Sequence, residues 1–238
     1  MSISRHAGNL VAPRVTGPEA MLDAVRAYGI IPFFENIVPG YSIEEMTPSQ
    51  NWFDTQEDIS RTPWDWKIHC IQSGEIVYGK FLLGGKAAFA TIGLYRELMN
   101  WRLSLPGNKP TVEQQKVLDY VAENGSIGIK EVRQLLGIKK GPADALMARL
   151  QMQCRIVTGN ITRVYRGADL HYNGWQTSSF CDPRSLWEID NPWAARFGDV
   201  GPMAPVHSPM ESFLIVKETI GQNVPEISDK LIDKLLQL

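Results

Sequence analysis

The side chains of this chain that are best suited to chemistry are cationic, and they concentrate in its middle. Between Lys109 and Gly167 the sequence has ten basic and five acidic residues, whereas the rest has fourteen basic and twenty-one acidic residues. Neutralisation of phosphates by Lys and Arg supplies the sequence-independent part of DNA affinity. This asymmetry therefore predicts an anionic partner for the basic part. The candidate phosphate contacts are Lys139, Lys140, Arg149, Arg155, Arg163 and Arg166.

Two tryptophans offer a second kind of contact with a nucleic acid. The run Pro63-Trp64-Asp65-Trp66 brings two indoles close together in the sequence, and stacking on an aromatic ring contributes roughly 1–3 kcal/mol per base. Tryptophans at this spacing also commonly pack a core or seal two subdomains. We keep both hypotheses for Trp64 and Trp66, and core packing is the favoured one.

Cysteine and histidine do not form a pattern that binds metal. The three cysteines, Cys70, Cys154 and Cys181, lie far apart without a Cys-x-x-Cys pair, and the four histidines are scattered. A zinc site needs clustered ligands, and a disulfide framework needs an even, dense set of cysteines. We therefore predict no metal and no cofactor, and no Ser-His-Asp or Cys-His set can be assembled from the sequence.

The sequence also lacks a segment typical of membranes or export. No stretch approaches the roughly 18 consecutive apolar residues of a membrane helix. The two arginines within Met1–Val15 are not followed by an apolar block, so no signal peptide is visible. We expect a cytoplasmic protein without a membrane partner, and no oligomeric state is predicted.

Three short helices are predicted where the basic residues lie. The first spans about 111–125 and begins with a Thr-x-x-Gln capping box, and the second spans about 129–137. Each ends at a glycine, the residue that most readily closes a helix. The third helix opens at Gly141-Pro142 and has apolar residues at helical spacing over 143–150.

A β-hairpin is predicted after the third helix. Segments 154–157 and 161–165 are rich in β-forming residues and flank Thr158-Gly159-Asn160, a turn signal. Three helices followed by a hairpin is the order of a winged helix, a helix-turn-helix variant whose last helix lies in the major groove. Lys139 and Lys140 would then begin that helix, and the arginines at 155, 163 and 166 would lie on or beside the wing.

The predicted fold class is α+β, with the winged helix between two further parts. The winged-helix domain is placed at 109–175, after a boundary rich in proline and glycine at 105–110. Residues 1–104 predict an N-terminal subdomain with a helix, an aromatic-rich irregular loop over 41–66, a β-hairpin and a second helix. Residues 176–238 predict a proline-rich loop and C-terminal helices.

Four short runs resemble bacterial proteins described as AlkZ-related. The resemblance covers roughly residues 18–185, and the runs are Pro63-Trp64-Asp65-Trp66, Tyr78-Gly79-Lys80-Phe81, Asn100-Trp101-Arg102 and Tyr172-Asn173-Gly174-Trp175. That family is similar to AlkZ-type DNA glycosylases, DNA-repair enzymes built from winged helices that excise alkylated or crosslinked bases. The resemblance implies a winged-helix architecture and double-stranded DNA as a partner.

The resemblance also implies a catalytic hypothesis. AlkZ-type glycosylases carry a Gln-apolar-Gln or Gln-apolar-Asp motif whose polar pair positions the water that attacks the sugar, and Gln151-Met152-Gln153 has this order. A flipped-out nucleotide with a cationic base needs little acid assistance, so orienting one water can suffice. Those enzymes are considerably longer, with several winged helices and a β-barrel. The alternative is that Gln151 and Gln153 are exposed polar residues at a helix end.

Three functions remain open from the sequence. The leading hypothesis is a winged-helix DNA-binding protein related to AlkZ-type glycosylases but without catalytic activity. The second is a monofunctional DNA glycosylase that excises alkylated bases through Gln151 and Gln153. The third is a winged-helix protein-interaction module, because a fold alone does not determine a function.

Overall fold

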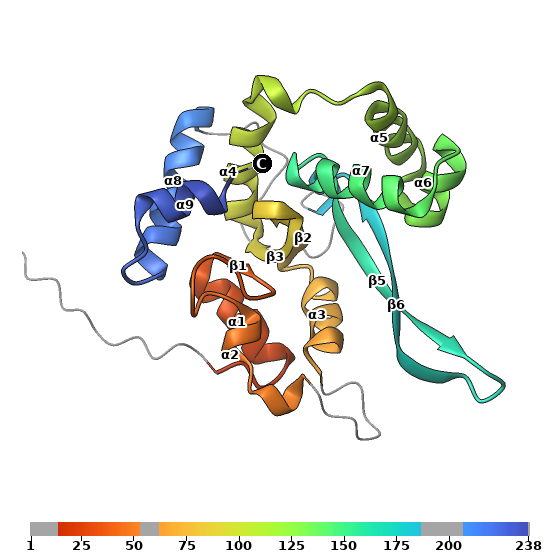
Figure 1. Cartoon of the computed structure of the whole chain (residues 1–238), viewed down its shortest axis with the longest axis horizontal. Helices are drawn as coiled ribbons and strands as arrows, with labels where there is room; N and C mark the ends of the chain where they lie inside the picture. The colour runs from red at the N-terminus through yellow and green to blue at the C-terminus, as the bar shows by residue number, and fades with distance from the viewer. Residues whose placement is uncertain (1–13, 53–61, 187–206, 238) are drawn as a thin grey trace, which may run out of the picture.

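A computed structural model describes residues 14–52, 62–186 and 207–237 of the chain, and its architecture is α+β as predicted (Figure 1). Within these residues six strands form one antiparallel sheet with the order β1-β3-β2-β5-β6-β4. Strands β2 and β5 are joined only through the pair Tyr78 and Thr158. This narrow pairing connects the strands of the N-terminal part with those of the basic part.

The N-terminal part begins with a helix whose ends follow from its sequence. Helix α1 (Pro18–Tyr28) has proline in its first turn, where the missing N–H has no helical partner to lose. It stops at Gly29, whose positive φ of 74° favours glycine. Strand β1 (Ile30–Pro32) follows and pairs with β3, and the short helix α2 (Ile43–Met46) comes next.

The prediction of an irregular segment over 41–66 is wrong near its beginning, where α2 lies, and at its end. Helix α3 spans Pro63–Gln72 and begins where the sequence has its Pro-Trp-Asp-Trp run. A surface helix is recognised by an apolar stripe opposite a polar face. Seven of the ten residues of α3 are buried, and Asp65 and Lys67 are among them. The helix therefore lacks the polar face opposite an apolar stripe by which a surface helix is recognised in a sequence.

The predicted hairpin of the N-terminal part is confirmed. Strands β2 (Ile76–Leu82) and β3 (Lys86–Thr91) pair across a tight turn that contains Gly84 and Gly85, both with positive φ. Helix α4 (Ile92–Ser104) follows directly. The sequence signal was clear here because glycine is the residue that tolerates this backbone conformation.

The basic part has three helices in the predicted order. The capping box joins Thr111 and Gln114, and glycines with positive φ end the first two helices. A short strand between these helices was not predicted. The elements are α5 (Val112–Asn124), β4 (Ser126–Gly128), α6 (Ile129–Leu136) and α7 (Lys140–Met152).

The predicted turn at Thr158-Gly159-Asn160 is wrong. Strand β5 (Val157–Arg166) runs straight through it and pairs with β6 (His171–Cys181), so the turn lies at 167–170. The register shifts at Gly159, where a Cβ would lie 2.8 Å from the sulfur of Cys181. The glycine therefore permits a close approach between strands rather than a turn. The sequence also predicts a loop after Trp175, but β6 continues to Cys181, so this prediction is wrong over residues 176–181.

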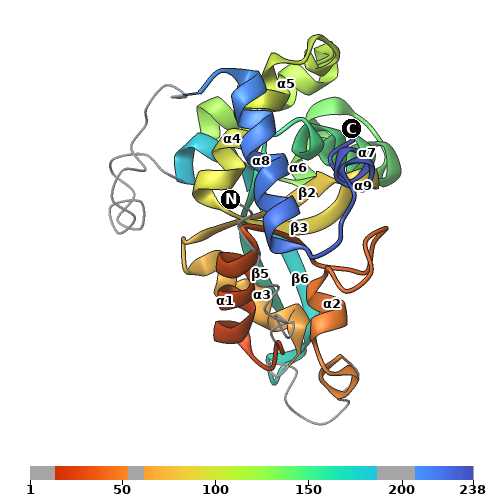
Figure 2. The same ribbon diagram turned by 90° about the vertical axis from the view of Figure 1, so that its left-hand side faces the viewer.

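Two helices close the described chain, as predicted. Helix α8 (Pro209–Asn223) packs along α4, which Figure 2 shows, and α9 (Asp229–Leu235) packs on α8. Ser208 caps α8 with a capping box. The prolines of the predicted loop at 192, 202 and 205 lie outside the described residues.

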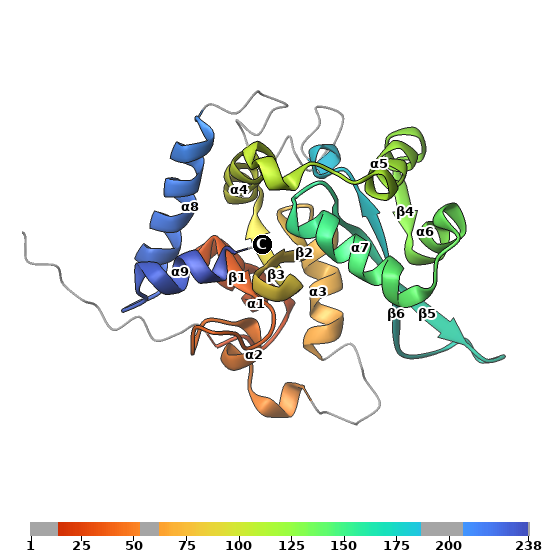
Figure 3. The ribbon, with the colours of Figure 1, turned by 45° about the horizontal axis from the view of Figure 1, so that its top comes forward.

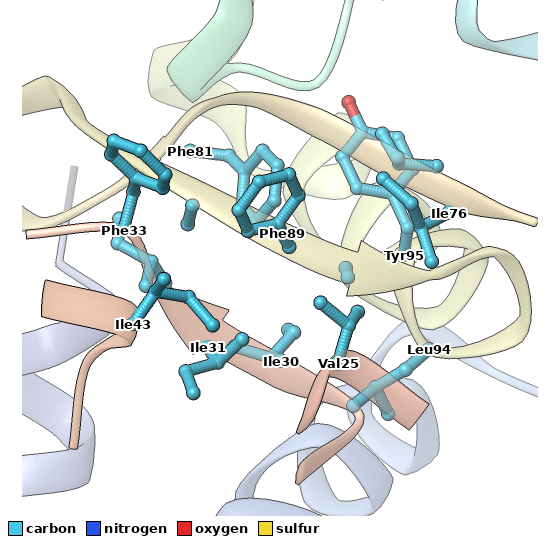
Figure 4. Close-up of a cluster of buried hydrophobic side chains, with 14 of the residues drawn as sticks. Val25, Ile30, Ile31, Phe33, Ile43, Ile76, Phe81, Phe89, Leu94 and Tyr95 are labelled. Carbon is cyan, nitrogen blue, oxygen red and sulfur yellow. The ribbon is translucent and has the colours of Figure 1, made fainter. Parts of the chain in front are cut away.

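The buried apolar side chains form two clusters. The larger one is built from α1, the first three strands, α4 and the C-terminal helices. Figure 4 shows part of it, with Phe89 of β3 opposite Ile31 of the neighbouring strand β1. The smaller cluster lies among the helices of the basic part and contains Val117, Val121, Ile127, Val132, Ala143, Met147, Leu150 and Ile156.

A buried cation joins segments that are far apart in the sequence. Arg102 is 0% exposed and donates hydrogen bonds to the carbonyl oxygens of Phe81 at 2.6 Å, Met152 at 2.7 Å and Leu236 at 3.0 Å. Burial lowers the pKa of its guanidinium. Since an unpaired buried polar group is costly, these bonds fix the ends of β2, α7 and α9 relative to one another.

Candidate nucleic-acid interface

A cleft of about 890 Å³ separates the N-terminal part from the basic part. Its walls come from α3 and β2 on one side and from α6, α7 and the β5–β6 hairpin on the other. Sites for small molecules and cofactors have volumes of about 300–1,000 Å³, so this space suffices for one nucleotide. Its charged and amide side chains are Lys67, Lys80, Lys130, Glu131, Gln134, Asp144, Gln151 and Gln176.

Gln151 lines this cleft from the last turn of α7. Its amide nitrogen donates to the carbonyl of Met147 at 3.2 Å, and its oxygen accepts from the backbone N–H of Lys80 at 3.1 Å. A Cβ on Gly79 would lie 3.2 Å from that oxygen, so the glycine leaves room for the amide. Gln151 is only 3% exposed and has one fixed orientation, and the alternative of an exposed polar residue is wrong.

Gln153 lies apart from this arrangement. It ends α7 as its C-cap residue, is 2% exposed, and does not belong to the described residues that line the cleft. Its side-chain oxygen is buried without a hydrogen-bond partner in the described part of the chain. The exposed-residue alternative is therefore wrong for Gln153 too, but the structure does not bring both glutamines into one cavity.

Lys139 and Lys140 lie at the beginning of α7. The helix starts at Lys140, one residue before the predicted start at Gly141. Lys139 is the N-cap residue and Lys140 the first residue of the helix, and both side chains are exposed. No side chain caps this helix end. Helix N-termini carry free N–H groups and the positive end of the helix dipole. Positive charge therefore accumulates at this exposed end.

Arg163 contacts a carboxylate of the protein itself. Its Nε and one terminal nitrogen donate to the two oxygens of Asp65 at 2.8 and 2.5 Å, and the Tyr172 hydroxyl donates to Asp65 at 3.2 Å. Asp65 is 4% exposed, and the pair raises the pKa of Arg163. Gln176 adds a bond to the carbonyl of Trp64 at 3.0 Å. These contacts attach the hairpin to α3.

The other candidate arginines differ in their surroundings. Arg155 is half-buried and donates from two nitrogens to the carbonyl of Asn108, at 3.1 and 2.9 Å. Arg149 is half-exposed in the last turns of α7. Arg166 is exposed, and its guanidinium lies 5.1 Å from the ring centre of Trp175. Contact of each with DNA stays a prediction.

The two tryptophans of the 63–66 run have different environments. Trp66 is 5% exposed and belongs to the larger core cluster. Trp64 is 41% exposed, and its ring lies 5.5–5.7 Å from the rings of Phe33, Phe34 and Trp52. Trp64 therefore combines packing in an aromatic cluster with a partly open surface.

The end of the β5–β6 hairpin extends away from the helices of the basic part, as Figures 1 and 3 show. Three large apolar side chains on it are exposed: Tyr165 at 53%, Leu170 at 70% and Trp175 at 58%. Sequence reasoning missed this arm because it placed the turn too early. It also missed Lys67 and Lys80 as cleft residues, since neither residue type nor spacing indicated which elements would face α7.

The comparisons agree with the resemblance found in the sequence. The family model described as AlkZ related matches residues 15–237. No curated protein and no solved structure has detectable similarity to the chain. Among the described helices none has the length and apolar character to cross a membrane. A family match over almost the entire sequence is decisive, and the chain therefore belongs to the AlkZ-related family.

Proposed function

We propose that this protein binds double-stranded DNA through a winged helix made of α5, β4, α6, α7 and the β5–β6 hairpin. The observation that carries the proposal is the exposed cationic N-terminus of α7, with Lys139 and Lys140. In helix-turn-helix proteins the N-terminal residues of the last helix reach the base edges in the major groove. Family membership supports the same partner.

The two halves of α7 suit different tasks. Its first half exposes most of its residues and buries Ala143 in the smaller cluster, whereas its second half packs on β2 and on the turn after it, with Leu150 and Gln151 buried. The first turn of the helix thus presents exposed side chains on the surface away from Ala143, as contact with a groove requires. The hairpin supplies a second contact, with Arg166 and Trp175 on one exposed surface.

Removal of the two lysine charges tests the DNA proposal. Lys139→Ala together with Lys140→Ala weakens binding to any duplex and reduces the salt slope of log affinity by about 2, because each phosphate contact contributes about 0.9. The matched control replaces Lys230 and Lys234 of α9, which are also exposed, and leaves the slope unchanged. Failure of the unmodified protein to bind any nucleic acid at low salt would favour the protein-interaction module instead.

A second candidate function is DNA glycosylase activity, and the position of Gln151 favours it. The amide is held by two hydrogen bonds in the wall of a cleft that has room for a nucleotide. Such fixed dipoles stabilise a transition state without reorganisation. Gln151 would orient the attacking water, and a flipped-out alkylated nucleotide would occupy the cleft.

An abasic-site assay on methylated duplex separates the enzyme from the pure binding protein. Base release by the unmodified protein that falls at least tenfold in Gln151→Ala supports the glycosylase. Gln134→Ala is the control, because Gln134 is an exposed glutamine of the same cleft. Gln153→Ala, away from the cleft, retains more activity than Gln151→Ala. If saturating unmodified protein releases bases only at the background rate, glycosylase activity is excluded.

A further inference from the structure

Lys67 differs from the other cationic residues that line the cleft. Lys67, on α3, is 8% exposed, whereas Lys80 and Lys130 are exposed. Its amine lies over the aromatic cluster, 4.9 Å from the ring centre of Trp64 and 5.8 Å from that of Phe33. A lysine that only contacts phosphates needs an accessible, hydrated charge. The position of Lys67 between rings and cleft suits a different role.

The carboxylate of Asp65 offsets only a small part of the cost of burying the charge of Lys67. Both oxygens of Asp65 accept hydrogen bonds from Arg163, and one of them accepts a further bond from Tyr172. The remaining attraction of Asp65 raises the pKa of Lys67, but burial outweighs it and lowers that pKa to about 8. Roughly one amine in ten is then unprotonated at neutral pH, so a free lone pair faces the cleft.

We propose that Lys67 is a nucleophile that forms an imine with the aldehyde of an abasic deoxyribose in the cleft. The inference rests on the proposed binding of DNA with an extruded sugar, and it adds a covalent step that base excision by Gln151 does not include. A lysine desolvated in an apolar pocket is a recognised Schiff-base nucleophile. The substrate class is abasic DNA, the product that a monofunctional glycosylase leaves behind.

The step is balanced without an oxidant or a reductant. The lone pair of the Lys67 amine attacks C1′ of the open-chain sugar, and the carbonyl oxygen takes up a proton. The nitrogen of the resulting carbinolamine releases one proton to solvent, and its hydroxyl group takes up another. The C1′–O bond then breaks to release water, and the nitrogen lone pair forms the C=N bond of a protonated imine. Addition of water reverses the reaction. The aromatic rings beside the amine limit access of bulk water to the imine.

Reductive trapping tests this inference on the full chain. The protein is incubated with a duplex that contains one preformed abasic site, in the presence of sodium borohydride, which reduces the imine to a stable amine. We expect a covalent protein–DNA adduct that is at least tenfold less abundant in Lys67→Arg and Lys67→Met. Lys230→Ala, which removes an exposed lysine of α9 outside the cleft, is the control and forms the adduct normally.

The outcomes distinguish this inference from the proposed function. The abasic site is preformed, so trapping does not depend on glycosylase activity, and an absent adduct despite base release overturns the imine alone. Lys67→Arg retains the positive charge, so its affinity for abasic duplex stays within threefold. Peptide mapping of the reduced adduct of the unmodified protein identifies the modified amine even if the variants fold poorly. An adduct on the N-terminus or on another lysine overturns the inference.

Discussion

The ion pair between Arg163 and Asp65 permits a sharp test of what holds the hairpin in place. We predict that Arg163→Ala destabilises the protein more than Asp65→Asn does, although the two changes remove the same ion pair. The side chain of Asp65 is 5% exposed, whereas that of Arg163 is 38% exposed. Loss of the arginine therefore leaves a charge with little access to water, and loss of the carboxylate does not.

The magnitudes follow from these exposures. Removing one partner of a buried ion pair costs roughly 3–5 kcal/mol. After Arg163→Ala, the Tyr172 hydroxyl still donates to Asp65 and water can enter the vacated space, so we expect a loss of about 2–3 kcal/mol. After Asp65→Asn, the half-exposed guanidinium remains partly hydrated and the amide oxygen still accepts one bond. The expected loss is about 1 kcal/mol.

Urea unfolding measures these losses, and DNA binding provides a second measurement on the same variants. Arg163 is bound to Asp65, so Arg163→Ala should leave the salt slope of DNA affinity unchanged. Arg166→Ala is the matched control, because Arg166 is an exposed arginine of the same strand. It should leave the free energy of unfolding within about 0.5 kcal/mol and reduce the salt slope by about 0.9.

The reverse pattern would refute this reasoning. If Arg163→Ala loses as little free energy of unfolding as Arg166→Ala and lowers the salt slope, then Arg163 contacts phosphate and the ion pair does not hold the hairpin. A larger loss in Asp65→Asn than in Arg163→Ala would show that desolvation of the carboxylate does not dominate the energetics of the pair.

Three further predictions concern the buried cation, the cleft lysine and the cleft glutamine. Arg102→Met leaves three carbonyl oxygens without their donor and lowers the free energy of unfolding by about 3–5 kcal/mol; a loss below about 1 kcal/mol in urea unfolding contradicts this. Lys67 has a pKa of about 8 in the folded protein and 10.5 unfolded, so the unfolded chain binds more protons between these values. The free energy of unfolding of the unmodified protein, minus that of Lys67→Met, should therefore rise by up to about 3 kcal/mol from pH 8 to 10.5. Urea unfolding measures this difference, and a difference that does not change with pH would show that burial does not lower the pKa of the amine. Gly79→Ala places a methyl group 3.2 Å from the Gln151 oxygen and should slow base release without changing DNA affinity, whereas equal rates in the variant and the unmodified protein contradict the role of that amide.

Sequence reasoning succeeded where a residue's backbone chemistry determines the local structure. The capping box at Thr111 and the glycines at 29, 125 and 137 set helix ends through interactions within a few residues. These signals placed α5 and α6 nearly residue by residue. The α+β class followed from them, and the family match confirmed the resemblance.

Sequence reasoning failed where distant segments decide the role of a residue. Gly159 looked like a turn residue, and only its contact with Cys181, across the sheet, explains it. Gln151 and Gln153 looked equivalent, yet a difference of two positions at the end of α7 directs one into the cleft and the other away from it. Lys67 carried no signal, because α3 is buried on most of its surface.

The bonds of Arg102 have a consequence for how the chain matures. Two of its acceptors, Phe81 and Met152, are synthesised long before the third, Leu236, in the last residues of the sequence. Until the segment that contains Leu236 has been synthesised, the desolvated guanidinium therefore lacks one of its three carbonyl acceptors. A chain truncated before α9 would lose the Leu236 acceptor of the buried Arg102 side chain and be degraded faster by proteases.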